Sequence, residues 1–307
     1  MPDPQSGVLP DGNAHATFMT LELKPGAESA SIVRRACSRV PILTEEVRGE
    51  AEGAEVFSVV AVGAGAWDGV FGGKKPKLLR PFTALEDGPR KAPSTRADIL
   101  VHIRSDRADL NFELARRVYA EFGDAASIVE EIHGFRYLDS RDITGFVDGT
   151  ENPTGDDRAD VALVDGEDPD FAGGSYIALQ RYIHDLPKWN TVAVSEQEQI
   201  IGRTKADNIE FKSDEKAPYA HIKRVSIKED GKSLELMRHS MPYGTAAEYG
   251  LYFIAYCGTP DNFDKMLERM IVSDADGPHD HLMDYTTAVT GASFFAPSLS
   301  FLESQAD

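Results

Sequence analysis

Cysteine is scarce in this sequence, with two residues, Cys37 and Cys257, in a chain of 307. Two cysteines cannot form the framework of several disulfides that stabilises many small secreted domains. Both lie in segments with apolar neighbours, which indicates buried thiols. The cysteine content therefore favours the reducing environment of the cytoplasm.

Basic residues are also few. The chain has 32 Lys and Arg against 51 Asp and Glu, and its formal net charge is -19. This excess of negative charge opposes broad contact with nucleic-acid phosphates or an anionic membrane surface. We therefore expect a small molecule or another protein as the partner, and no nucleic acid or membrane.

Long apolar runs are missing as well, so no segment is predicted to cross a bilayer. The first seven residues have neither the basic region nor the apolar region of a secretory signal. Arg34 and Arg35 lie in a predicted helix and are not followed by an apolar run of signal type. We expect a cytoplasmic protein.

The eight histidines form no His-x-x-x-His spacing, and no cysteine-rich zinc pattern occurs. His279 and His281 are close in sequence, but they stand in a polar loop where we expect solvated side chains. The sequence therefore predicts no structural zinc ion.

What the first half does contain is an alternation of strands and helices. We expect strands over 15–24, 56–62, 99–103 and 126–137, a helix over 27–39, and a second helix with the apolar stripe Leu110, Leu114 and Val118. Residues 64–97 are rich in proline and glycine and are expected to form a long binding or covering loop. The order of elements is typical of a ferredoxin-like α+β unit.

The second half resembles this plan with an insertion. Strands are expected over 175–184, 233–237, 250–257 and 292–296, and a helix capped by Thr259 or Asp261 precedes the last of them. A chain of this length is expected to form two domains. We predict an α+β protein with two ferredoxin-like domains, antiparallel sheets and peripheral helices, divided into residues 1–140 and 141–307.

The segment Gly145–Pro153, with the sequence GFVDGTENP, contains too many helix and strand breakers for a regular element. Glycines at 145 and 149 permit backbone angles that other residues avoid, and they restrict Asp148 between them. Asp148 is therefore a candidate proton carrier. Taken alone, the same residues are also typical of an ordinary surface turn.

His221 follows a charged stretch and begins a segment that we expect to be extended. Alone, it would more often be a structural histidine. However, five motifs in order resemble those of the dye-decolourising peroxidases, most closely the compact bacterial B-type members: GFVDGTENP at 145–153, IGRTK at 201–205, AH at 220–221, RHSMPYG at 238–244 and DYTTAVTG at 284–291. The similarity also reaches residues 95–104, so it covers nearly the whole chain.

The resemblance implies haem b, iron protoporphyrin IX, held mainly by the second domain. By position, His221 resembles the proximal iron ligand, Asp148 the distal acid and Arg238 the distal arginine. Ser240 stands where some relatives have asparagine and would be a distal hydrogen-bonding residue. The resemblance further implies cofactor contacts from Gly149, Thr150 and Glu151, from Arg203 near a haem propionate, and from Asp284 as the acceptor for the second nitrogen of His221.

The implied activity is the reduction of hydrogen peroxide and the oxidation of dyes, phenols or other small organic reductants through an oxidised ferryl haem. In this chemistry a permanently protonated arginine stabilises developing negative charge, and an acid carries a proton. The resemblance also implies a homo-oligomer. Residues 301–307 show no obvious docking tail for an encapsulating partner.

Two alternatives stay open at this point. A haem-binding or haem-handling protein with little turnover would use His221 but would not need Asp148 together with Arg238. A calcium-binding module would use the acidic segment 148–170, although its spacing is not that of an EF-hand and such acids more often lie on a solvated face.

Overall fold

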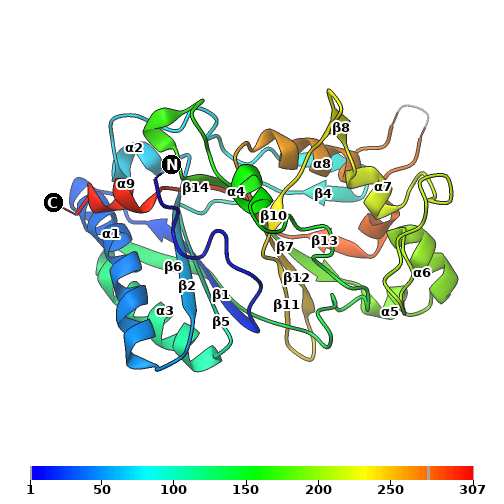
Figure 1. Ribbon diagram of the computed structural model, residues 1–307, viewed down its shortest axis with the longest axis horizontal. Coiled ribbons are helices and arrows are strands. Elements are labelled where there is room, and N and C mark those ends of the chain that lie inside the picture. Colours follow the sequence, from blue (N-terminus) through cyan, green and yellow to red (C-terminus); the bar gives the residue numbers. More distant parts are fainter. Residues whose placement is uncertain (1, 275–276, 307) are drawn as a thin grey trace.

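A computed structural model describes residues 2–274 and 277–306 of the chain (Figure 1). The elements of the first half, in order, are β1 (His15–Leu23), α1 (Ala27–Glu50), β2 (Val56–Gly63), α2 (Trp67–Val70), β3 (Leu85–Asp87), β4 (Arg90–Ala92), β5 (Ile99–Ser105), α3 (Ala108–Phe122) and β6 (Ala126–Phe135). In this described part, no helix is both long enough and apolar enough to span a membrane.

The second half contains more short elements. They are α4 (Asp157–Ala162), β7 (Ser175–His184), α5 (Leu186–Trp189), α6 (Val194–Ile201), α7 (His221–Val225), β8 (Lys228–Glu229), β9 (Lys232–Ser233), β10 (Met237–Arg238), β11 (Met241–Gly244), β12 (Tyr249–Cys257), α8 (Asp261–Ile271), the 3-10 helix η3 (His281–Asp284), β13 (Thr286–Ala288), β14 (Ala292–Ala296) and α9 (Leu299–Glu303).

The main sheet is antiparallel and joins both halves of the chain. Strands of the first half follow the order β6-β1-β5-β2, and β14 connects β2 to β7. Strand β12 pairs with both β7 and β11, while β11 reaches β6 through the single pair Tyr243 and Gly134. Among the described residues, these pairings close the strands into a barrel. The protein is therefore a mixed helix and antiparallel-sheet fold, as expected.

Alternation along the strands separates two apolar clusters. Met19, Val60 and Val101 point toward the cluster that contains the buried faces of α1 and α3, whereas Phe18 and Val59 belong to the cluster inside the barrel. Figure 1 shows α1 and α3 together on one side of the first-half strands. Because successive strand residues face opposite sides, each of these strands is covered on both faces.

The helix α1 is longer than predicted. The sequence suggests an end near residue 39, but α1 continues to Glu50 with Pro41 inside it. A proline inside a helix removes one backbone hydrogen bond and costs about 3 kcal/mol. The buried stripe of α1 nevertheless continues past it through Leu43, Thr44 and Val47, and packing of that stripe outweighs the local cost.

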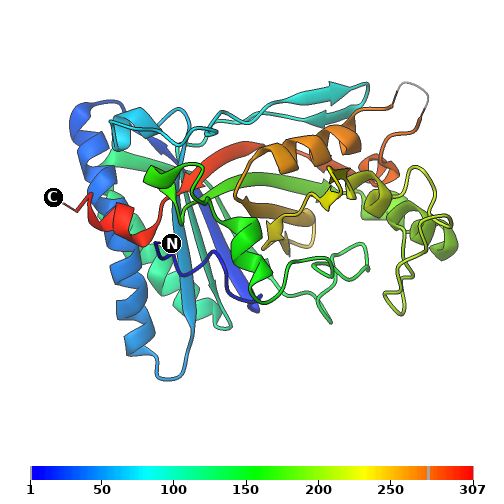
Figure 2. The same ribbon diagram turned by 45° about the horizontal axis from the view of Figure 1, so that its top comes forward.

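The long segment 64–97 is not one irregular loop, because it contains α2 and the β3–β4 hairpin. Figure 2 shows this hairpin extending over the second half beside α8. Arg90 fixes the contact by donating from Nε to the carbonyl oxygen of Ile271 at 2.8 Å. A first-half segment therefore packs on a helix of the second half.

Both cysteines are buried free thiols, as predicted. Burial raises the pKa of Cys37 to about 12 and that of Cys257 to about 11. Neither side chain is therefore a thiolate at neutral pH, and neither has the character of a reactive cysteine.

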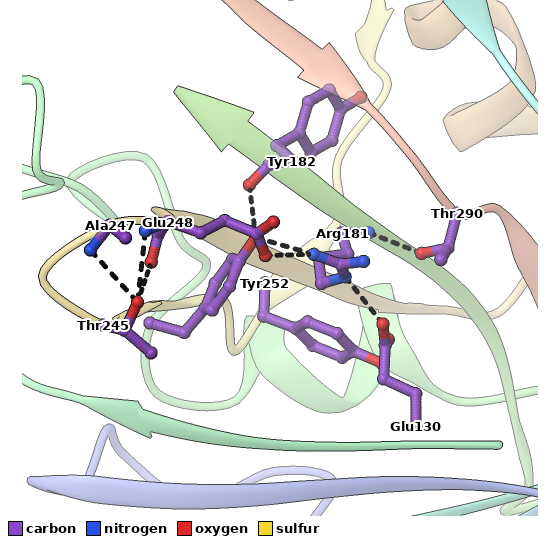
Figure 3. Close-up of polar contacts among 9 residues, drawn as sticks. Glu130, Arg181, Tyr182, Thr245, Ala247, Glu248, Tyr252 and Thr290 are labelled. Carbon is purple, nitrogen blue, oxygen red and sulfur yellow. Dashed lines mark hydrogen bonds and ion pairs between the residues drawn. The ribbon is translucent and has the colours of Figure 1, made fainter. Parts of the chain in front are cut away.

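A polar cluster joins β6 to the second half (Figure 3). Arg181 of β7 contacts the Glu130 carboxylate from Nε at 2.6 Å, and Tyr252 donates its hydroxyl hydrogen to the same carboxylate at 2.9 Å. Arg181 also reaches Tyr243 Oη at 3.2 Å and Glu248 Oε1 at 2.8 Å. Glu130 therefore satisfies two donors from different strands.

A Glu130→Ala variant is expected to lose about 1–3 kcal/mol of unfolding free energy, because it leaves Arg181 and the Tyr252 hydroxyl without their shared acceptor. The side chains of Glu130 and Arg181 are 17% and 19% exposed, so water offsets part of the loss. Urea unfolding of the full-length protein measures the change. Glu248→Ala is the matched control: its side chain is 52% exposed, and a loss below about 1 kcal/mol is expected. Equal losses in the two variants would contradict this account.

Two neutral histidines lie beside a buried cation near the barrel interior. Arg104 donates from Nη1 to His239 Nδ1 at 2.9 Å, and the Tyr256 hydroxyl lies 2.8 Å from His102 Nδ1. Burial, and then the charge of Arg104, hold the pKa of both histidines well below 6.5. Unfolding restores their ordinary pKa, so the unfolded chain binds more protons than the folded chain below that value.

The contribution of these histidines to the free energy of unfolding is therefore fully present above about pH 6.5. It falls as the pH decreases from there toward their pKa values in the folded protein. Each contributes a slope of at most about 1.4 kcal/mol per pH unit in that window. Urea unfolding of a His102→Gln variant across this range should show a shallower slope than the parent. His133→Gln is the control, because it makes the same substitution at a side chain that is 63% exposed.

Candidate active site

A cavity of about 360 Å³ lies against β7 and β12, between these strands, helices α7 and α8, and the loop that follows β6. This size falls within the usual range for small-molecule and cofactor sites. Its apolar lining includes Leu251 and Phe253 of β12 and Phe263, Met266 and Met270 of α8. The predicted site residues on its wall are Asp148, Gly149, Thr150, Glu151, Arg203, His221, Arg238 and Ser240.

The loop that carries Asp148 is held by its own backbone contacts. Gly145 and Gly149 have φ angles of +92° and +79°, in the left-handed region that favours glycine, as their positions suggested. The Asp148 carboxylate accepts a hydrogen bond from the Gly149 amide at 2.7 Å, and the Asp148 amide donates to Ser140 O at 3.1 Å. The carboxylate is therefore placed at the cavity by a fixed turn.

Asn152 joins this loop to the segment that carries Arg238. Its side chain donates from Nδ2 to Arg238 O at 2.7 Å and accepts from the Arg238 amide at 3.1 Å. This pair of bonds fixes the backbone of Arg238 relative to the Asp148 loop. Asn152 lies in the motif at 145–153, but the motif gives no indication of this role, because its partner is 86 residues away.

Arg238 and Ser240 enter the cavity from the edge of β12. Arg238 pairs with Ala255 of β12 through β10, and Ser240 Oγ accepts from the Ile254 amide at 3.2 Å. The Ser240 hydroxyl donates to Ile254 O at the longer distance of 3.5 Å. Ser240 therefore has a bond to the sheet and still lines the cavity.

His221 lies at the first residue of the short helix α7, so the prediction of an extended segment was wrong. Arg224 of the same helix donates to the carbonyl oxygens of Arg269 and Val272 at the end of α8. These tertiary bonds favour the helical turn, and no local periodicity in five residues could have indicated it.

The second nitrogen of His221 contacts Asp280, not Asp284. His221 Nδ1 lies 2.6 Å from Asp280 Oδ2, and the Asp280 side chain is fully buried. Asp280 also caps η3 by accepting from the Leu282 amide at 2.9 Å. The prediction for Asp284 is therefore wrong: its carboxylate contacts His279 Nε2 at 2.9 Å, and it does not line the cavity.

Arg203 is buried at the cavity wall, with 5% of its side chain exposed. Its Nη1 donates to Asn208 Oδ1 at 2.6 Å and its Nη2 contacts Glu151 Oε1 at 3.0 Å. The Nε–H group has no partner among the described residues. An unpartnered buried donor on a cation is suited to an anionic group of a bound cofactor.

Strand β7 contributes polar side chains that the sequence analysis did not select. Gln180, Tyr182 and His184 alternate along it and line the cavity. His184 bonds Asp142 at 3.1 Å and Thr286 at 2.8 Å. Burial opposes the negative charge of Asp142, but His184 and Thr144 outweigh it and lower the pKa of that carboxyl. The period-two pattern of β7 could have identified this row once one face was known to border a ligand.

The donor set fits haem. Asp280 occupies Nδ1 of His221, and Nε2 has no bonding partner in the described parts of the chain. The cavity adds an apolar lining, the buried Arg203 cation, and a carboxylate and a guanidinium from Asp148 and Arg238. An imidazole ligand, an apolar enclosure and distal polar groups are the features by which proteins hold haem and set its reactivity.

Family comparisons cover nearly the whole chain. Residues 5–136 match the model of the N-terminal part of Dyp-type peroxidases, and residues 139–301 match that of the C-terminal part.

Individual relatives cover similar lengths. The chain is 41% identical to the dye-decolorizing peroxidase of Mycobacterium tuberculosis over 91% of this chain and 84% of that protein. It is 42% identical to a DypB variant from Rhodococcus jostii in complex with heme, with a TM-score of 0.96 and 99% of both chains covered. The encapsulated DyP-type peroxidase of Mycobacterium smegmatis is 39% identical, with a TM-score of 0.95 over 99% of this chain and 98% of that one.

Proposed function

The chain belongs to the dye-decolourising peroxidase family and is a haem peroxidase, and we propose that His221 ligates the iron while Asp148 and Arg238 activate hydrogen peroxide. The observation that carries the proposal is their convergence: the three side chains line one cavity, although they come from α7, the loop after β6 and β10. A protein that only carried haem would not need this carboxylate and guanidinium together, so the carrier alternative is not favoured.

On the proximal side, Asp280 would accept the Nδ1 proton of His221, which would leave the lone pair of Nε2 for the iron. A buried carboxylate on the far nitrogen fixes the ring orientation and makes the imidazole a stronger electron donor. When bound, haem would supply the iron centre and the two electrons that reduce the peroxide O–O bond, and it would recover those electrons from the organic donor. We assign no cofactor contact to Asp284.

On the distal side, Asp148 would take a proton from one oxygen of hydrogen peroxide and give it to the other, so that the second oxygen leaves as water when the O–O bond breaks. A positioned carboxylate is suited to this transfer. Arg238 stays protonated and stabilises the negative charge that develops between the two proton transfers. Ser240 supplies a hydrogen bond near the same oxygen atoms.

The remaining assignments concern cofactor binding. Arg203 binds a propionate through its unpartnered Nε–H group, and Gly149, Thr150 and Glu151 form the adjacent wall. Glu151 and Asn208 hold the guanidinium in place, since both contact it. A planar guanidinium with a free donor is well suited to a carboxylate.

The architecture is proposed as two ferredoxin-like domains, residues 1–140 and 141–307, with haem bound mainly by the second. The strand order β6-β1-β5-β2, with α1 and α3 as connecting helices, supports this assignment for the first domain. In the second, β7, β12, α8 and β14 are the corresponding candidates. Within the described ranges, the residues that line the cavity all come from the second half, which supports this placement.

The partners are proposed as hydrogen peroxide and a small organic reductant, a dye or a phenol, with a homo-oligomer as the assembly. The two buried thiols support a cytoplasmic location. Encapsulation of this chain is supported by its similarity to the encapsulated peroxidase of Mycobacterium smegmatis.

The test is the visible absorption spectrum of the purified, haem-loaded protein before and within a second of adding one equivalent of hydrogen peroxide. An immediate spectral change that is reversed by an organic electron donor is the expected result. A haem spectrum that is indifferent to peroxide would support the carrier function instead. A protein that binds no haem would contradict the assignment of His221.

A further inference from the structure

Outside the cavity, the segment after α8 brings two histidines and an aspartate together. Atoms of His279, His281 and Asp284 that can act as metal ligands all lie within 4.8 Å of one another. His279 Nε2 and Asp284 Oδ1 are 2.9 Å apart, and the centres of the two imidazole rings are 5.0 Å apart. The sequence analysis expected these histidines to be solvated, but the turn at η3 gathers them around one point.

The scaffold holds this cluster in place. The His281 ring stacks on Tyr219 with a centroid distance of 3.9 Å and an interplanar angle of 8°, and the His281 amide donates to Tyr219 O at 3.2 Å. The carbonyl oxygen of Asp284 accepts from Lys188 Nζ at 2.8 Å, which fixes the other end of η3. Two of the three ligand residues are therefore positioned by contacts that do not use their ligand atoms.

The neighbouring charge also suits a cation. The Asp284 carboxylate is a negative ligand group, and its Oδ1 lies 2.9 Å from His279 Nε2. Carboxylate oxygens and imidazole nitrogens together are typical ligands of divalent transition ions.

We propose that His279, His281 and Asp284 form a binding site for one divalent transition ion, with Zn²⁺ as its representative. Two imidazole nitrogens and one carboxylate oxygen are typical ligands of Zn²⁺ and related ions, while Ca²⁺ and Mg²⁺ prefer oxygen ligands alone. Ligands at about 2.0–2.1 Å from a tetrahedral ion lie about 3.3 Å apart. Side-chain rotations would bring the present separations, which run from 2.9 Å to at most 4.8 Å, to that value, and water would complete the coordination.

This site is separate from the haem cavity, since none of its three ligand residues lines that cavity. It nevertheless includes the two sequence neighbours of Asp280, which contacts His221. An ion bound here would fix the segment that presents Asp280 to the proximal histidine. The site does not depend on the proposed peroxidase function, because zinc binding needs no turnover.

The experiment is equilibrium dialysis of the haem-loaded full-length protein against micromolar free Zn²⁺, followed by elemental analysis of zinc and iron. We expect one zinc per chain in the parent and none in His279→Asn or Asp284→Asn. The matched control is His133→Asn, because His133 forms another histidine–carboxylate pair, with Glu131 at 3.1 Å, and is not part of the cluster. It should keep the parent stoichiometry.

Three results would overturn the proposal: no zinc in the parent, zinc retained in both site variants, or equal loss in the His133 control. Circular dichroism and the haem-to-protein ratio establish that each variant is folded and loaded. Using both His279→Asn and Asp284→Asn keeps the test valid if one of them fails to fold.

Discussion

Replacing Arg238 by leucine is expected to lower kcat/KM for hydrogen peroxide by about 10²–10³-fold, the usual cost of removing a donor that stabilises developing negative charge. Leucine keeps much of the side-chain volume but removes the charge. The backbone should stay in place, because Asn152 bonds the amide and carbonyl groups of residue 238 and not its side chain. Stopped-flow measurement of the spectral change after peroxide addition gives the rate directly.

The companion variant is Asp148→Asn, which removes the proposed proton carrier and keeps its shape. A loss of about 10²–10⁴-fold is expected, within the range for a positioned acid or base. If the two residues act on the same step, the double variant should lose much less than the product of the single losses. A parent-like rate in either single variant would remove that residue from its proposed role.

Controls for this pair come from outside the cavity. Asp156→Asn changes an exposed carboxylate in the same connection, and Arg136→Leu changes an arginine whose side chain is 45% exposed. Both should react with peroxide at the parent rate. Losses in these variants would show that the effects at 148 and 238 reflect general damage to the fold.

Regular elements could be predicted well where one physical signal was sufficient. The bounds of β7 and β14 match the expected strands 175–184 and 292–296, because turn residues on either side of an apolar strand indicate where it begins and ends. The end of α1 was predicted near residue 39, although its buried stripe continues beyond Pro41 to Val47. Packing of the whole helix decided the outcome, and that packing depends on β2 and on α3, which is distant in sequence.

In the active site, too, residues in local motifs could be predicted, whereas contacts between distant positions could not. Asp148, Arg238 and His221 were selected through their motifs, and all three line the cavity. Their supporting partners were missed or misassigned because those contacts are long-range: Asn152 and Arg238 are 86 positions apart, and His221 and Asp280 are 59 apart. No periodicity links such positions. Asp280 and Asp284 both lie downstream of His221, and only the turn into η3 determines which carboxylate points inward.

Asp280→Asn tests that correction, and we expect it to weaken haem retention or peroxide reactivity by about 10–100-fold. The buried Asp280 carboxylate accepts from His221 Nδ1 through one oxygen and from the Leu282 amide through the other. Asparagine has a single acceptor oxygen and no charge, so it can satisfy only one of these donors. The proximal imidazole then loses its orientation, its electron donation, or both.

Haem transfer to an acceptor protein and the iron–histidine stretching frequency measure these two effects separately. A lower frequency is expected, because a neutral partner makes His221 a weaker donor. Asp284→Asn, studied with a chelator present to remove divalent ions, should match the parent in both measurements, since Asp284 contacts His279 and not His221. If Asp284→Asn changed the frequency and Asp280→Asn did not, the acceptor would be Asp284, and the proximal arrangement described here would be wrong.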